Sequence, residues 1–229
     1  MRLIRRMISV SCLACAAFAG VMAQTITLEK LLDQLEEQGA TIKSMAAALE
    51  QKKWTEILEE FDEGEFGRFL FLKAKEQIFL RKDIEVPQLS SLVIADGEVV
   101  FFQPVIKQAQ KFRLGKNKDK AEFLVLGFGT TREALEEAYE LKLLGEEKVG
   151  DTQAWVLEMV PRSDRVQAFF AKIVLWIDGR RWIPIQQKLV EPSGDYLLVR
   201  FSEVQLNPRL NPSDFKLKLP RGTRVVGLN

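Results

Sequence analysis

The stretch 90-SSLVIADGEVVFFQP-104 decides which fold we expect for this chain of 229 residues. Asp96-Gly97 predicts a two-residue hairpin turn, because a type I′ turn needs a positive φ angle at both central residues. The two flanks are apolar on both faces, whereas a hairpin with one face in water alternates apolar and polar residues. Some other part of the protein must therefore cover the second face.

Apolar runs of strand length recur from residue 64 onward at regular spacing. Short turns join them, so they predict an antiparallel meander of about nine to eleven strands. Three arrangements would bury both faces of such strands: a sandwiched sheet, a dimer, or a half-barrel curled around an apolar cavity. The residues alone leave these three open. The excess of apolar residues on both faces recurs in 69-FLFL-72, 173-IVLWI-177 and 196-YLLVRF-201.

Three helices are expected besides the strands. Thr27 is a typical N-cap before the helical apolar spacing of residues 28–38, and Gly39 is placed to end this first helix. Residues 41–54, TIKSMAAALEQKKW, carry apolar side chains at helical spacing and predict a second helix. Thr131 is expected to cap a short helix inserted between two strands.

Residues 1–23 have the pattern of a bacterial secretory signal peptide: three arginines, a short apolar run, and small residues before a cleavage site after Ala23. The apolar run is too short to span a bilayer. Lipidation at Cys12 or Cys15 is the alternative, but the residues before each cysteine match a lipobox poorly. We therefore expect a periplasmic protein in which residues 24–229 form a single domain without cysteine.

The composition disfavours several classes of function. The chain has no histidine, which removes the commonest general base and the commonest metal ligand. Adjacent acidic pairs such as Glu36-Glu37 point apart and make poor acid–base partners. The formal net charge of +1 gives no electrostatic reason to expect nucleic acid as a partner. We therefore expect a protein that is not an enzyme and that uses neither a metal nor a cofactor.

Two motifs resemble those of the outer-membrane lipoprotein carriers, the LolA-like periplasmic lipoprotein chaperones. The first is the hairpin with its continuation, 93-VIADGEVVFFQPVIKQAQKF-112. The second is the tail 210-LNPSDFKLKLPRGTRVV-226, which is similar to the family's closing Phe-x-x-x-x-Pro-x-Gly-x-x-Val. The order of parts, from signal peptide through helix and strands to this tail, is similar over about residues 28 to 227. In the tail, the matching residues are Phe215, Pro220, Gly222 and Val225.

The resemblance implies a mainly β member of the α+β class, an incomplete antiparallel β-barrel covered by N-terminal and inserted helices. Members hold the acyl chains of lipoproteins in the apolar interior and make or break no bond. They receive their cargo from an inner-membrane release complex and pass it to an outer-membrane acceptor. We expect a monomer with the same partners. The alternatives are a half-barrel sensor or regulatory module, such as an envelope-stress regulator, and a carrier of another envelope lipid.

The residues expected to contact acyl chains lie on the predicted inner face of the half-barrel. Ordinary core packing is the competing interpretation, because most buried aromatic side chains simply pack. The family has an arginine that ties barrel to lid near residue 74; here Ala74 and Lys75 stand there, and Lys73, Lys75 or Arg81 are the expected substitutes. The cavity candidates are Phe69, Phe71, Ile78, Leu80, Phe101, Trp155, Leu157, Met159, Trp176, Leu197 and Phe201, and the lid candidates are Leu31, Leu35, Leu126 and Phe128.

Overall fold

The computed structural model describes residues 26–74, 77–113 and 128–227, so the predicted signal peptide lies outside the described residues. Strands make up most of the described chain, and the helices are short and few. In chain order the elements are α1 (Leu28–Thr41), β1 (Ser44–Thr55), β2 (Glu60–Phe61), β3 (Glu65–Ala74), β4 (Gln77–Val86), β5 (Ser90–Ala95), β6 (Glu98–Gln103), β7 (Gln108–Arg113), α3 (Arg132–Ala138), β8 (Tyr139–Val149), β9 (Thr152–Pro161), α4 (Asp164–Gln167), β10 (Lys172–Asp178), β11 (Pro184–Val190), β12 (Tyr196–Leu206), the 3-10 helix η3 (Pro212–Phe215) and β13 (Arg224–Gly227).

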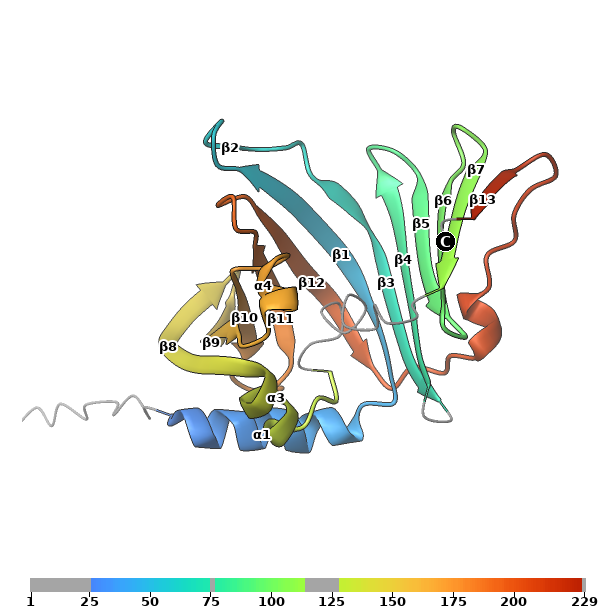
Figure 1. The fold of residues 1–229 in the computed structure, drawn as a ribbon. Helices are drawn as coiled ribbons and strands as arrows, with labels where there is room; N and C mark the ends of the chain where they lie inside the picture. The colour runs from blue at the N-terminus through green and yellow to red at the C-terminus, as the bar shows by residue number, and fades with distance from the viewer. Residues whose placement is uncertain (1–25, 75–76, 114–127, 228–229) are drawn as a thin grey trace, which may run out of the picture.

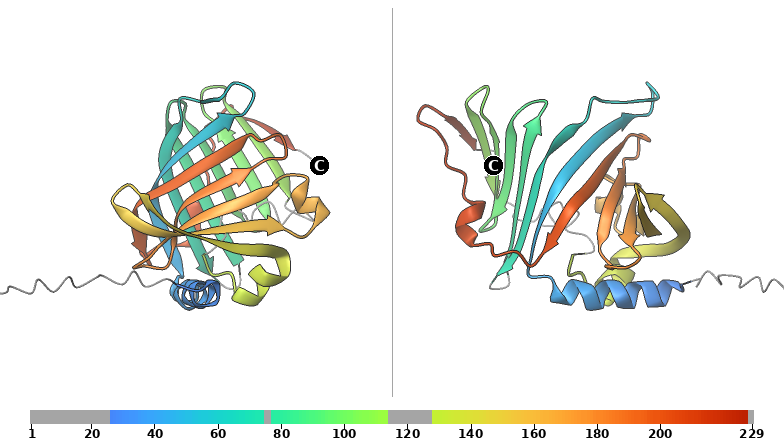
Figure 2. Two further views of the ribbon diagram at one scale, coloured as in Figure 1. Left: turned by 90° about the vertical axis from the view of Figure 1, so that its left-hand side faces the viewer. Right: turned by 180° about the vertical axis from the view of Figure 1, so that it is seen from behind.

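The strands form one 13-stranded sheet in the order β13-β7-β6-β5-β4-β3-β1-β12-β11-β10-β9-β8, with β2 paired to β1 beside this path. Neighbouring strands are antiparallel except β13, which runs parallel to β7. The edge strands β13 and β8 do not pair with each other, so the sheet stays open (Figure 1). Figure 2 shows that the strands of its two halves cross at an angle. The predicted half-barrel is confirmed.

The turn at Asp96-Gly97 has the predicted geometry. Asp96 has φ 52° and Gly97 has φ 74°, the two positive angles of a type I′ turn. Ala95 pairs directly with Glu98 across it, and the pairing continues to Ser91 with Phe102. The turn therefore sets the register of β5 and β6, and with it the face to which each apolar side chain points.

α1 lies across one end of the half-barrel, with α3 beside it (Figure 1). The Thr27 side chain accepts a hydrogen bond from the Lys30 backbone N–H at 3.3 Å, as its N-cap role predicts. The helix continues past Gly39 to Thr41. Gly39 is needed for close approach instead, because a Cβ atom there would lie 2.9 Å from the backbone nitrogen of Gly129.

The prediction of a second helix over residues 41–54 is wrong. Ser44–Thr55 forms β1, which lies between β3 and β12 at the centre of the sheet. Met45, Ala47 and Leu49 alternate along it and are buried, so the same residues fit a strand as well as a helix. Helix propensity determines secondary structure only weakly, so pairing with two long strands overrides the helical preference of the alanines.

The C-terminal segment answers the question of what covers the second face. Phe215 of η3 is 1% exposed and packs with Leu72, Phe79 and Val93. Its ring lies 5.7 Å from that of Phe79, centroid to centroid. Val93 of the opening hairpin therefore packs beneath the tail, whereas its neighbour Ile94 faces the interior of the half-barrel. We call these two sides the outer face and the concave face.

Substitution of Gly67 by alanine should disrupt the centre of the sheet. A Cβ atom at this position of β3 would lie 1.9 Å from the backbone oxygen of Asp83 on β4, and neither backbone can give way cheaply. We expect Gly67→Ala to lower the free energy of unfolding by about 3 kcal/mol, measured by urea denaturation. Gly227→Ala is the matched control, because nothing lies within 4 Å of its Cβ position. Equal stability of the two variants would contradict the packing at Gly67.

Candidate functional site

The concave face is continuous across the sheet. The strand register places Phe71 opposite Leu80 and Leu157 opposite Leu175, and side chains of one face recur at every second residue. This face brings together all the cavity candidates except Trp176. They are Phe69, Phe71, Ile78, Leu80, Phe101, Trp155, Leu157, Met159, Leu197 and Phe201.

Most of these side chains pack against other protein atoms. Phe71 is 1% exposed, and Leu157 and Met159 are fully buried. Ile78 is 43% exposed at the start of β4. The half-buried members are Phe101, Trp155 and Leu197. The concave face is thus largely closed in this structure, and the cavity beneath the helices stays a prediction.

Trp176 points the other way. It follows Leu175 on β10 and pairs with Val156, so alternation directs it to the outer face. Its indole Nε1 donates a hydrogen bond to Glu147 Oε2 at 2.7 Å. Trp176 also packs against the cluster that contains Phe69, Phe71 and Phe201, so its role as a cavity residue stays a prediction.

α1 and Phe128 cover the concave face, and we call them the lid. Leu31 and Leu35, two of the expected lid residues, are buried against the strands β9–β11. The Phe128 ring packs against Phe71 and Phe201, with centroid distances of 6.5 Å and 6.0 Å. Leu126 lies outside the described residues. Five further residues belong to the cluster that holds the lid but were not among the predicted site residues, although helical spacing or strand alternation marks them. They are Leu32 of α1 and, packed with α1, Leu135, Ile173, Leu175 and Leu189.

Arg132 ties α1 to α3, whereas the family's arginine has no counterpart near residue 74, where Ala74 and Lys75 stand. Arg132 of α3 donates to Asp33 of α1 and to Glu136, each at 2.8 Å. These hydrogen bonds raise the pKa of the Arg132 guanidinium above its usual value. Arg81 is a wrong substitute, because it points to the outer face and binds Asp83 there at 2.8 Å. Lys75 lies outside the described residues, and the side chain of Lys73 is exposed.

A short chain of polar side chains lies on the concave face, in addition to the buried Gln187. Lys82 lies opposite Phe69 and Leu92, and its Nζ donates to Gln51 Oε1 at 3.0 Å. The Gln51 Nε2 donates in turn to Glu65. Burial lowers the pKa of Lys82 below its usual value, and the nearby carboxylate of Glu65 opposes part of this shift. The concave face therefore offers one desolvated ammonium group among apolar side chains.

The edge of the half-barrel away from α1 carries most of the exposed large apolar side chains. The loops β1–β2, β4–β5 and β6–β7 lie along this edge (Figure 1). Ile57 at the tip of the first loop is 89% exposed. Such a concentration is typical of a surface that contacts a membrane, a ligand or a protein. We call it the apolar rim; its members are Ile57, Leu58, Phe61, Val86, Leu89, Val105 and Ile106.

Two kinds of feature are absent from the described residues. Among them, no group of three or more Asp, Glu, Cys or His side chains is placed to hold a metal ion. In the same part of the chain, no helix is both long and apolar enough to cross a bilayer.

Comparison with known proteins defines the fold. A family model described as "Uncharacterized protein" matches residues 129–215, and no curated protein sequence matches the chain. An uncharacterized conserved protein from Thermus thermophilus aligns with TM-score 0.56 and 16% identity, over 87% of this chain and 98% of that one.

Two further structures share this architecture. MucB aligns with TM-score 0.52 and 16% identity over 86% of this chain, which spans 64% of MucB. The lipoprotein LppX of Mycobacterium tuberculosis aligns with TM-score 0.51 and 9% identity, over 81% of this chain and 99% of that one. The half-barrel fold expected from the sequence is confirmed.

Replacement of Lys82 by methionine should change how stability depends on pH. Because the folded pKa of Lys82 lies below 10.5, the unfolded chain binds more protons between the two pKa values, and stability rises with pH there. We expect the native protein to gain stability relative to Lys82→Met as the pH rises to about 10.5, measured by urea unfolding across this range. The exposed Lys148→Met is the control and should follow the native curve. Parallel curves for Lys82→Met and the native protein would refute the desolvated ammonium group.

Proposed function

We propose that this protein is a periplasmic carrier that binds the acyl chains of lipoproteins on its concave face and transfers lipoproteins from the inner to the outer membrane. The observation that supports this proposal best is the largely apolar concave face, covered by an amphipathic helix mainly through apolar contacts. Such contacts are non-directional, so an acyl chain can replace them. The signal peptide expected in residues 1–23 accounts for the location.

Magnitudes favour such an exchange. Burial of Leu31, Leu32 and Leu35 stabilises the closed lid by roughly 5–9 kcal/mol in total, at about 1.5–3 kcal/mol for each side chain. An acyl chain with about 14 buried methylene groups gains roughly 11 kcal/mol. One chain therefore suffices to displace α1, and handover to a more apolar acceptor would let the lid close again.

The apolar rim gives the proposal an entrance. The rim lies at the end of the half-barrel away from α1, so an acyl chain arriving there reaches the concave face without passing the helix (Figure 1). Trp54 and Tyr196 stack at 5.8 Å beneath Phe61 and support the β1–β2 loop. Firmly held apolar side chains suit docking to an inner-membrane release complex or an outer-membrane acceptor.

The proposed function is binding without catalysis, by a monomer and without a cofactor. One of the three similar structures is that of a lipoprotein. A half-barrel regulatory module is the second candidate, since MucB shares the fold. A regulatory module would bind a protein segment in place of an acyl chain. A carrier of another envelope lipid is the other alternative, and it would bind an acyl chain that carries no peptide.

Binding of a fluorescent diacylated lipopeptide tests the proposal. We expect the purified mature chain to bind it in a one-to-one complex that resists dilution, and to ignore the same peptide without acyl chains. Leu32→Ser should speed uptake severalfold, because one of the contacts that close the lid is lost. Leu144→Ser, at an exposed position of β8, is the control and should match the native rate. A chain that binds neither the lipopeptide nor a free fatty acid would overturn the proposal.

A further inference from the structure

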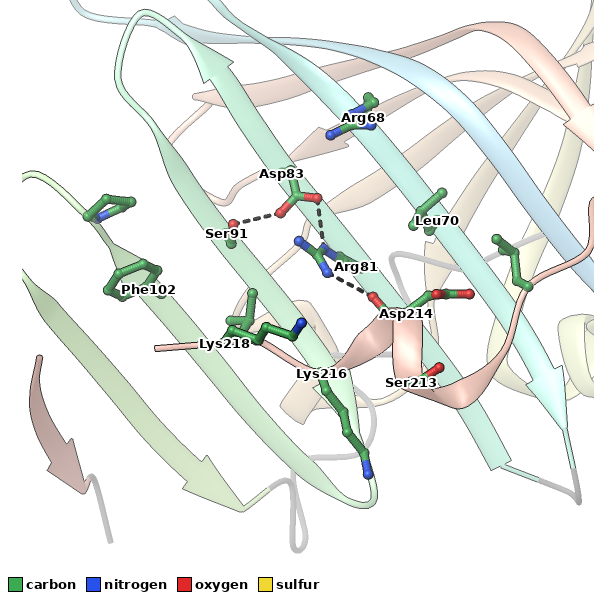
Figure 3. Close-up of a pocket in the computed structure, with 13 residues that line it drawn as sticks. Arg68, Leu70, Arg81, Asp83, Ser91, Phe102, Ser213, Asp214, Lys216 and Lys218 are labelled. Atoms are coloured by element: carbon green, nitrogen blue, oxygen red, sulfur yellow. Dashed lines mark hydrogen bonds and ion pairs between the residues drawn. The ribbon is translucent and has the colours of Figure 1, made fainter. Parts of the chain in front are cut away.

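A pocket of about 590 Å³ lies on the outer face, between β3–β6 and the C-terminal segment (Figure 3). It is separated from the concave face by the sheet itself. Its volume lies in the range of small-molecule sites. Neither the fold nor the proposed carriage of acyl chains explains it.

One part of the pocket is apolar. Leu70 of β3 and Phe102 of β6 form the sheet side, and Leu210 and Leu217 of the C-terminal segment lie across from them. Leu70, Leu210 and Leu217 also pack against the buried cluster around Phe215. The apolar part is therefore a fixed surface, and it is wide enough for a short alkyl group.

The other part of the pocket is positively charged. Arg81 is held rigidly: its Nε pairs with Asp83 Oδ2 at 2.8 Å, and its Nη1 donates to the backbone oxygen of Asp214 at 2.8 Å. The hydroxyl of Ser91 donates to Asp83 at 2.6 Å and fixes that carboxylate in turn. The side chain of Lys218 extends toward Arg81 and Asp214 (Figure 3).

The charges of the lining do not balance. The lining holds four cations, on Arg68, Arg81, Lys216 and Lys218, and the carboxylates of Asp83 and Asp214, while Arg68 pairs with Glu85 at 2.9 Å. The Asp214 carboxylate accepts the Asn211 backbone N–H at 2.8 Å, and Asp83 is bound to Arg81. Within the described parts of the chain, the ammonium group of Lys218 has no hydrogen bond or ion pair. The pocket thus has an excess of positive charge, and the ammonium group of the exposed Lys218 is a free donor in its lining.

We propose that this outer pocket binds an amphiphilic anion, a molecule with a phosphate or carboxylate head and a short alkyl part. The head accepts hydrogen bonds from Lys218 and lies beside the fixed guanidinium of Arg81. The alkyl part covers Leu70, Phe102 and Leu217. Charge-assisted hydrogen bonds to such a head are stronger than neutral ones, and apolar burial adds to them. This site is independent of the proposed carriage on the concave face.

Titration with octyl phosphate, inorganic phosphate and octyl glucoside tests the site, with amide NMR shifts to locate binding. We expect octyl phosphate to bind and to shift the signals of Ser91, Phe102 and Lys218. Inorganic phosphate should bind at least tenfold more weakly because it lacks the alkyl part. Octyl glucoside should not shift these signals, because it has the alkyl part without the charge.

Lys218→Ala should weaken octyl phosphate about tenfold. Lys148→Ala, an exposed lysine on β8, is the matched control and should leave the affinity unchanged, and both variants should bind the diacylated lipopeptide as the native chain does. Unchanged affinity in Lys218→Ala, or shifts confined to the concave face, would overturn the site. Equal binding of inorganic phosphate and octyl phosphate would overturn the amphiphilic ligand.

Discussion

The structure depends on one constraint: a sheet that is apolar on both faces must be covered on both. Three segments far apart in the sequence meet this need. α1 and Phe128 cover the concave face, while Phe215 and the segment after it cover the outer face. The opening hairpin lies between the two layers, since Ile94 packs inward and Val93 outward. Neither cover is a second sheet, which is why the half-barrel can stay open.

The two covers differ in how they are held. The outer cover is joined to the sheet by polar groups, because Arg81 binds the backbone of η3 and the Asn211–Asp214 pair closes its turn. The inner cover rests on leucines, on Phe128 and on two exposed polar contacts: Arg132 with Asp33, and the Asn207 amide with the Thr41 carbonyl at 3.1 Å. Exposed ion pairs contribute little to stability. The inner cover is therefore the one that an apolar ligand can replace.

Much of this architecture follows from local sequence signals, and the exceptions have physical reasons. Asp96-Gly97, the Thr27 cap and the alternation of the strands predict elements whose chemistry is local. Residues 44–55 are misread because alanine-rich alternation fits both periods, and only pairing with β3 and β12 decides between them. The covering role of Phe215 and the direction of Arg81 depend on contacts between distant segments. Local patterns in a single sequence do not predict such contacts. The concave residues are largely predictable, but periodicity cannot separate a ligand surface from a packed core.

The central claim is that an acyl chain and α1 compete for the same concave face. The most direct measurement is methyl NMR of the mature chain with a diacylated lipopeptide that carries a spin label in one acyl chain. The account predicts that the methyl signals of Leu80, Leu157 and Met159 broaden strongly, while those of Val225 on the distant edge strand β13 broaden far less. Bound lipopeptide that leaves the three concave signals sharp would contradict it.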